Sequence, residues 1–257
     1  MRFRLLTENL ASEMYWLAEW GFSAWIEYGD HQILFDSGFS DVWVRNAGHA
    51  GIDLETADVI ALSHFHRDHT RGLLSHPFLP GKRLICHPRV LEDSLETDDQ
   101  RILDDYSRIR QVLARDFRVE PTTAATEFLP GAFYLGEVPR VTGFEKGAFF
   151  DDPMPDDTAL AFRSPEGAIV VSGCSHAGIC NICEYAKEAT GQKLRAVIGG
   201  FHLLHDEDPP VAETIAYFLE QRPARLMPVH CIDFDIQTRL AALPGYERPG
   251  AGSLIEF

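Results

Sequence analysis

The densest group of residues that could do chemistry is SHFHRDH at positions 63–69, directly after the apolar run VIAL. If the strand continues into this segment, His64 and His66 point to the same side, because side chains alternate along a strand. A following turn can then bring Asp68 and His69 back towards the same point. Imidazole and carboxylate suit zinc, iron or manganese. The segment predicts a metal site with room for two neighbouring ions; the alternative is a polar surface turn.

Three further histidines occupy comparable places later in the chain. His176 in VVSGCSH, His202 in VIGGFH and His230 in RLMPVH each follow an apolar, strand-like run. Strand ends are where α/β folds place their functional sites. These histidines are therefore candidates to complete the site.

Alternating strand and helix patterns run through the whole chain and predict an α/β protein. No long linker or internal repeat divides it, so a single domain over 1–257 is expected. Predicted helices span 40–51, 177–190, 210–221 and 235–243, with one or two charged surface helices within 89–127. Predicted strands span 2–9, 24–29, 31–36, 57–63, 82–87, 132–142, 158–164, 167–173, 194–200, 224–230 and 253–257.

Composition narrows the class of partner. The formal net charge is −16, from 23 Lys and Arg against 39 Asp and Glu, which disfavours nucleic acid. No apolar stretch approaches the roughly twenty residues that span a bilayer. Five cysteines, an odd number, are not a secreted disulfide framework. We expect a cytoplasmic protein with reduced thiols and a small-molecule substrate, without nucleic-acid or membrane partners; the oligomeric state is not predicted.

The pattern His64-x-His66-x-Asp68-His69, with Asp36 at the end of an earlier strand, resembles the metallo-β-lactamase superfamily. A narrower resemblance is to the archaeal-type pterin-related ribofuranosylaminobenzene 5'-phosphate synthase-like proteins. It is carried by the segments TEN (7–9), LAEWGFSAWIE (17–27), VPRVTGFE (138–145), DDTAL (156–160), GCSHAGICN (173–181), GGFHL (199–203) and PVHC (228–231).

The resemblance implies a four-layer αββα metallo-β-lactamase-like sandwich with a dinuclear metal centre. It further implies that Asp36 orients ligands through hydrogen bonds. Zinc is the favoured metal, with iron or manganese as alternatives. The implied ligands are His64, His66 and His176 for one ion, and Asp68, His69 and His230 for the other.

Two departures from the superfamily pattern bear on the site. An aspartate that usually bridges the two metals is absent where the strand ends in GGFH, so either His202 contacts metal or substrate, or it is a structural histidine and the second position is weak. Arg71 stands where a glycine is common; it would bind an anionic substrate group or form a surface salt bridge. Asp157 would line the pocket or cap a strand.

The function expected from these residues is metal-dependent hydrolysis of a small ester or phosphoester through a metal-activated hydroxide. Asp68 would position the hydroxide and His202 would help to stabilise charge on the substrate. One alternative is an iron-containing redox member of the superfamily, and another is a non-catalytic or regulatory ligand-binding member.

Cysteines supply a last set of candidates. On a helix, Cys180 and Cys183 would lie one turn apart, as in redox or zinc-binding pairs. Packing as small buried hydrophobes is the favoured interpretation. Cys231, next to His230, is a further candidate for contact with the metal through its thiolate.

Overall fold

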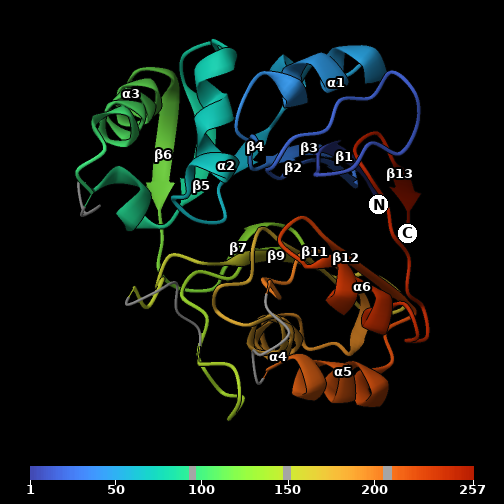
Figure 1. Ribbon diagram of the computed structural model, residues 1–257. Coiled ribbons are helices and arrows are strands. Elements are labelled where there is room, and N and C mark those ends of the chain that lie inside the picture. The colour runs from blue at the N-terminus through green and yellow to red at the C-terminus, as the bar shows by residue number, and fades with distance from the viewer. Residues whose placement is uncertain (93–96, 147–151, 205–209) are drawn as a thin grey trace. The chain divides into compact units, whose positions relative to one another are not determined.

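A computed structural model describes residues 1–92, 97–146, 152–204 and 210–257 (Figure 1). The chain divides into two compact units, of which the first comprises Met1–Thr122 with Pro249–Phe257 and the second Thr123–Arg248. Each unit combines one mixed sheet with helices, so the predicted α/β class is confirmed. The prediction of a single domain remains a prediction.

The first unit is built on a seven-stranded sheet in the order β13-β1-β2-β3-β4-β5-β6. Strands from β13 to β3 pair antiparallel, and β3 to β6 pair parallel. The strands are β1 (Arg2–Thr7), β2 (Ser23–Tyr28), β3 (His31–Phe35), β4 (Val59–Ala61), β5 (Lys82–Cys86), β6 (Phe117–Pro121) and β13 (Leu254–Glu256).

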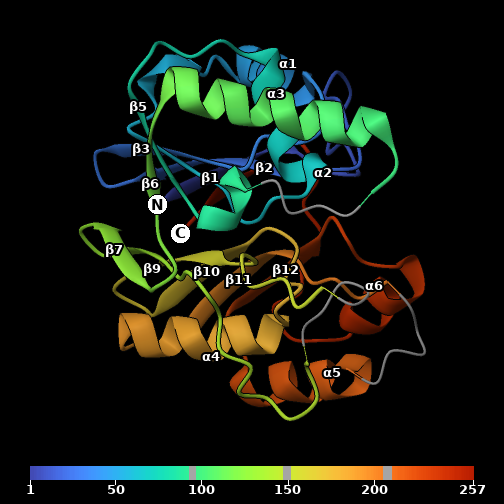
Figure 2. The same cartoon turned by 90° about the vertical axis from the view of Figure 1, so that its left-hand side faces the viewer.

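Helices α1 (Val42–Ala50) and α3 (Gln100–Asp116) lie on one face of this sheet (Figures 1 and 2). Asp99 begins α3 by accepting a hydrogen bond from the backbone N–H of Arg101, the usual way an Asp satisfies an unpaired helix-terminal donor. Four short helices connect the elements: η1 (Leu54–Thr56), α2 (Arg67–Thr70), η2 (Arg71–Ser75) and η3 (Pro88–Leu91). The short α2 begins within the histidine segment and contains Asp68 and His69, so it forms the turn at the end of that segment.

The second unit is built on a six-stranded sheet in the order β12-β11-β10-β9-β8-β7. Its strands are β7 (Thr126–Leu129), β8 (Ala132–Tyr134), β9 (Ala159–Phe162), β10 (Ala168–Ser172), β11 (Leu194–Gly200) and β12 (Arg225–Val229). Strands β10, β11 and β12 run parallel, so their carboxyl ends meet at one edge of the sheet.

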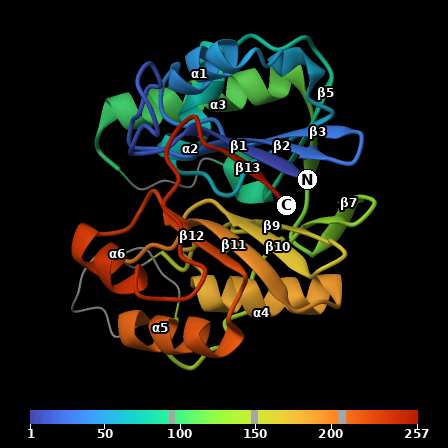
Figure 3. The same ribbon diagram turned by 90° about the vertical axis from the view of Figure 1, so that its right-hand side faces the viewer.

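Helices α4 (Ile179–Thr190), α5 (Pro210–Gln221) and α6 (Phe234–Leu240) lie on one side of the second sheet (Figure 3). The apolar faces of the helices and the sheet form one buried core that includes Val197, Phe201, Phe218 and Leu240. The rings of Phe201 and Phe218 stack with their centroids 5.6 Å apart. This packing fixes the backbone from which the later histidines project.

The prediction for residues 89–127 was wrong in part. The segment contains α3, but Phe117–Pro121 forms β6 and Thr126–Leu129 forms β7. Both lie at the edge of a sheet. Because an edge strand has one neighbour and little burial, FRVEP lacks the apolar run by which a strand is recognised. The strand predicted over 132–142 is also shorter, since β8 ends at Tyr134.

Among the residues that the structure describes, no helix has both the length and the apolar composition needed to cross a membrane.

Candidate metal centre

The predicted metal-binding segment of the first unit is held by the buried carboxylate of Asp36. Asp36 follows β3 with a left-handed φ of 57°. One of its oxygens accepts the backbone N–H of Ser63, and the other accepts Ser63 Oγ and His69 Nδ1, each at 2.7 Å. Asp36 and His69 are both fully buried. Asp36 therefore holds Ser63 and His69 in place by hydrogen bonds, and the orienting of metal ligands that the resemblance implies for it remains a prediction.

For neutral imidazole rings, this network favours one position of the ring proton on each histidine. Ser63 Oγ donates its single proton to Asp36. A neutral His64 ring, whose Nδ1 lies 2.8 Å from Ser63 Oγ, then donates to that oxygen from Nδ1. His69 donates from Nδ1 to Asp36 in the same way. Both rings are left with Nε2 as an electron-pair donor, which is the form a metal ion requires.

The spacing of the donor atoms fits a shared cation. His64 Nε2 lies 3.1 Å from His66 Nδ1, and two nitrogens bound to one tetrahedral zinc lie roughly 3.3 Å apart. His69 Nε2 lies 3.7 Å from a carboxylate oxygen of Asp68, a second nitrogen-and-oxygen pair. The first unit thus brings together four of the predicted ligands in two pairs, and their donor chemistry fits divalent metal ions.

Arg71 lies next to this cluster, but its guanidinium is engaged. It donates from Nε to Asp105 at 2.8 Å and from Nη1 to the Phe39 carbonyl at 3.1 Å. The same guanidinium lies over the Phe39 ring, 4.7 Å from its centroid. Arg67 also pairs with Asp105, at 3.0 Å. The ion pair between Arg71 and Asp105 is the salt bridge that the sequence analysis gave as the alternative role for Arg71. Substrate binding by Arg71 remains a prediction.

The second unit supplies the later histidines from its parallel strand ends. His176 follows β10, His202 follows β11 and His230 follows β12. The rings of His176 and His202 lie with their centroids 4.1 Å apart, so the predicted site histidine His202 is a neighbour of a predicted ligand. Both His202 and His230 have left-handed φ values, 50° and 59°, and strained backbone of this kind clusters at functional sites. The metal roles of His176 and His230 and the catalytic role of His202 remain predictions.

Asp157 supports the loop that carries His176. It is completely buried, and one carboxylate oxygen accepts the backbone N–H of Ala177 at 2.8 Å. Burial raises the pKa of Asp157 from 3.8 to about 7; the Ala177 N–H opposes this rise, and Asp156 adds to it. The substrate contact expected for Asp157 remains a prediction, while its observed partner is the backbone beside His176.

The raised pKa of Asp157 predicts a pH-dependent stability. A carboxyl that holds its proton more tightly when folded stabilises the native state at low pH, and this contribution is lost as the pH rises from about 4 to about 7. The full shift corresponds to at most roughly 4 kcal/mol. In chelated protein, Asp157→Asn is expected to flatten this part of the curve of unfolding free energy against pH, measured by urea denaturation. Asp104→Asn, at an exposed position on α3, is the control; equal slopes in both variants would contradict the assignment.

The sequence analysis did not identify the helix cap formed by Glu145. Glu145 is buried and accepts the N–H groups of Cys180 and Asn181 at the start of α4, at 3.0 and 2.8 Å; burial raises its pKa. The segment VPRVTGFE contained this residue without indicating its role.

Cys180 and Cys183 are fully buried on α4, and burial raises the pKa of each thiol. This agrees with packing as small hydrophobes.

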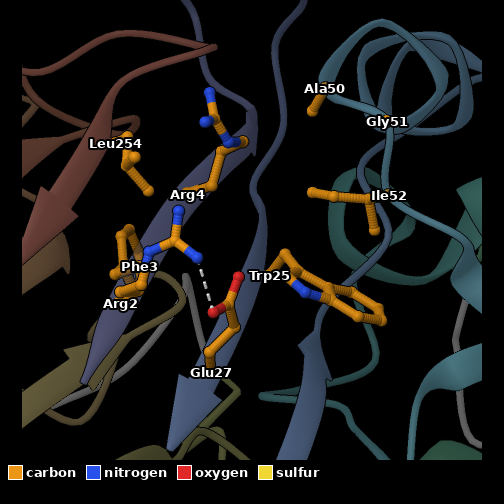
Figure 4. A pocket seen from close by; sticks show the side chains of 9 residues that line it. All are labelled: Arg2, Phe3, Arg4, Trp25, Glu27, Ala50, Gly51, Ile52 and Leu254. Atoms are coloured by element: carbon orange, nitrogen blue, oxygen red, sulfur yellow. Dashed lines mark hydrogen bonds and ion pairs between the residues drawn. The ribbon is translucent and has the colours of Figure 1, made fainter.

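A separate pocket of the first unit, with a volume of about 180 Å³, shares no residue with the histidine segment (Figure 4). Its two cations are already engaged: Arg2 pairs with Glu27 at 2.9 Å, and Arg4 donates to the Gly252 carbonyl at 2.8 Å. The pocket therefore offers little to an anionic ligand. It is lined by Arg2, Phe3, Arg4, Trp25, Glu27, Ala50, Gly51, Ile52 and Leu254.

Comparison with known proteins decides the family. A sequence model described as the metallo-beta-lactamase superfamily matches residues 21–215, which is more than half of the chain. The chain belongs to the metallo-beta-lactamase superfamily. The predicted family and fold are therefore confirmed, and the superfamily is one of metal-dependent hydrolases.

Several relatives share more than a quarter of their residues with this chain, and two of them carry informative descriptions. The structure of Tm1679, described as a metal-dependent hydrolase of the beta-lactamase superfamily, is 28% identical with a TM-score of 0.84, over 100% of this chain and 99% of that one. The Methanocaldococcus jannaschii protein named 7,8-dihydropterin-6-methyl-4-(beta-D-ribofuranosyl)-aminobenzene-5'-phosphate synthase is 29% identical over 88% of this chain and 84% of its own. Zinc-bound PqqB from Methylobacterium extorquens, at 15% identity and a TM-score of 0.61 over 100% of both chains, shares the fold.

Proposed function

We propose that the protein is a metal-dependent hydrolase that acts on a small ester or phosphoester. The observation that carries the proposal is the Asp36 network of the first unit. In neutral rings it places the proton of His64 and of His69 on Nδ1, and the buried carboxylate holds His69 directly and His64 through Ser63. A fixed tautomer and a fixed ring direction are what a ligand histidine needs, and a surface turn would not need them.

Two divalent ions are the proposed cofactors, with zinc favoured over iron or manganese. The chemistry that such ions supply when bound is a lowered pKa for water and stabilisation of negative charge. His64, His66, Asp68 and His69 would hold them, together with His176 and His230. Asp68, whose side chain is 21% exposed, would position the attacking water. His202 would donate a hydrogen bond to charge that develops on the substrate.

The proposed substrate is small and phosphorylated, or an ester of similar size. A net charge of −16 disfavours long polyanions. The archaeal relative is named for a ribofuranosyl-aminobenzene 5'-phosphate, which supports a phosphate-bearing small molecule. Because that relative is named a synthase, a second candidate is group transfer to or from such a phosphorylated ribofuranosyl compound.

The test begins with metal content per chain, measured by mass spectrometry on protein purified without added metal or chelator. Wild type is expected to hold about two ions, and His69→Ala fewer. His31→Ala is the matched control, because His31 lies in the same unit on β3 with a side chain 41% exposed. Metal content that is equal in all three proteins would overturn the proposed centre.

Turnover is measured on the same three proteins. Phosphomonoesters, phosphodiesters and lactones form the substrate panel, and release of phosphate or acid is the signal. Wild type and His31→Ala are expected to hydrolyse at least one class, and His69→Ala none. A visible absorption band of bound iron with no hydrolysis would favour the redox alternative, whereas ligand retention without turnover would favour a binding protein.

A further inference from the structure

The second unit carries a set of donor atoms that includes sulfur. Cys174 follows β10, His202 follows β11 and Cys231 follows β12. These three strands are neighbours and run parallel, so each contributes one residue to the same sheet edge. That edge is where α/β sheets bind ligands.

The donor atoms of the set lie close together. Cys174 Sγ, Cys231 Sγ and one ring nitrogen of His202 are all within 4.8 Å of one another. In a tetrahedral zinc site, donors of these types lie roughly 3.5 to 3.8 Å apart, so shifts of about 1 Å suffice to bind an ion. The two thiols are reduced and buried, and His202 is half-buried. The two sulfur atoms are therefore shielded from solvent, whereas the His202 side chain is partly exposed to it.

The backbone around Cys231 is shaped to place its sulfur. The N–H of His202 donates to Cys231 Sγ at 3.3 Å, the kind of hydrogen bond that supports a metal-bound thiolate. A Cβ on Gly200 would lie 2.6 Å from Cys231 Sγ and 2.4 Å from the Gly173 carbonyl oxygen. Gly200 therefore leaves the space that the sulfur occupies. The left-handed φ of His202 turns the chain at this point.

We propose that Cys174, His202 and Cys231 form a metal site of their own, which takes zinc or another thiophilic cation and leaves one coordination position open. Two thiolates and one imidazole are a known catalytic zinc set, and sulfur selects softer cations than the nitrogen and oxygen donors of the first unit. The three proposed ligands all belong to the second unit.

The test uses cobalt as the probe, because a cobalt–thiolate bond gives an intense near-ultraviolet charge-transfer band that nitrogen and oxygen ligands do not give. Full-length protein is chelated, dialysed and titrated with Co²⁺ under reducing conditions. Wild type is expected to develop the band, with a final intensity that corresponds to one thiolate-bound ion per chain in addition to the two ions of the proposed function. Cys231→Ser and Cys174→Ser are expected to lose it, and Cys183→Ser, at a buried thiol on α4, should keep it.

A His69→Ala variant separates this proposal from the proposed function. It should keep the thiolate band even though ions of the first unit are lost. A band that persists in both Cys174→Ser and Cys231→Ser would overturn the proposal. So would zinc-edge X-ray absorption of zinc-loaded wild type that shows only nitrogen and oxygen neighbours, a measurement that needs no variant to fold.

Discussion

Replacing Asp36 with alanine is expected to lower the free energy of unfolding by about 3 to 5 kcal/mol and to remove bound metal. The change leaves the N–H and Oγ of Ser63 and the Nδ1 of His69 without their acceptor in a fully buried setting. Breaking a buried charged network from one side costs about this much. Urea denaturation of chelated protein measures the stability, and mass spectrometry measures the metal.

Two variants bracket this expectation. Asp36→Asn keeps one oxygen acceptor and should fall between wild type and Asp36→Ala. Asp41→Ala is the matched control, because Asp41 is exposed and its side chain caps no N–H of α1; it should change stability by less than about 0.5 kcal/mol. If Asp36→Ala behaved like Asp41→Ala, the carboxylate would not be what holds the histidine segment.

Gly72→Ala is expected to destabilise the first unit by about 3 kcal/mol or more. A Cβ at Gly72 would lie 1.8 Å from the carbonyl oxygen of Ser37 and 2.8 Å from Trp43 Nε1. The first contact is with backbone, which cannot rotate away, and Trp43 is itself fixed because its indole N–H donates to the Gly72 carbonyl at 3.1 Å. Overpacking a core contact usually costs 1 to 3 kcal/mol, and a clash this short lies at or beyond the upper end.

Gly48→Ala gives the control for this prediction. Gly48 lies in α1, has no left-handed φ, and a Cβ there would meet nothing within 4 Å. Alanine should therefore stabilise the helix by up to about 1 kcal/mol. Denaturation curves of the two variants should shift in opposite directions, and a Gly72→Ala protein as stable as wild type would refute the close approach.

The histidine segment and the strand ends could be predicted because each depends on residues that are near in sequence. SHFHRDH follows a buried strand, and Asp36, His176, His202 and His230 each follow an apolar run. The α/β class rests on the same local periodicity.

Contacts between distant residues could not be predicted in this way. Arg71 meets Asp105 from 34 positions away, and Glu145 caps a helix that starts 34 positions later. In each case the residue types are compatible with many partners, and only the packed sheet and helices select one. Strand β6 was missed for a related reason, since its pairing with β5, and not its composition, makes it a strand.

Strand β13 pairs antiparallel with β1, so a segment more than 240 residues later in the sequence covers the edge of the first sheet. During synthesis the whole second unit emerges from the ribosome before this pairing can form. The first sheet is then left with β1 as an unprotected edge, which is a site for wrong pairing with another chain. The second unit is contiguous in sequence, whereas the sheet of the first unit is complete only once Leu254–Glu256 has been made.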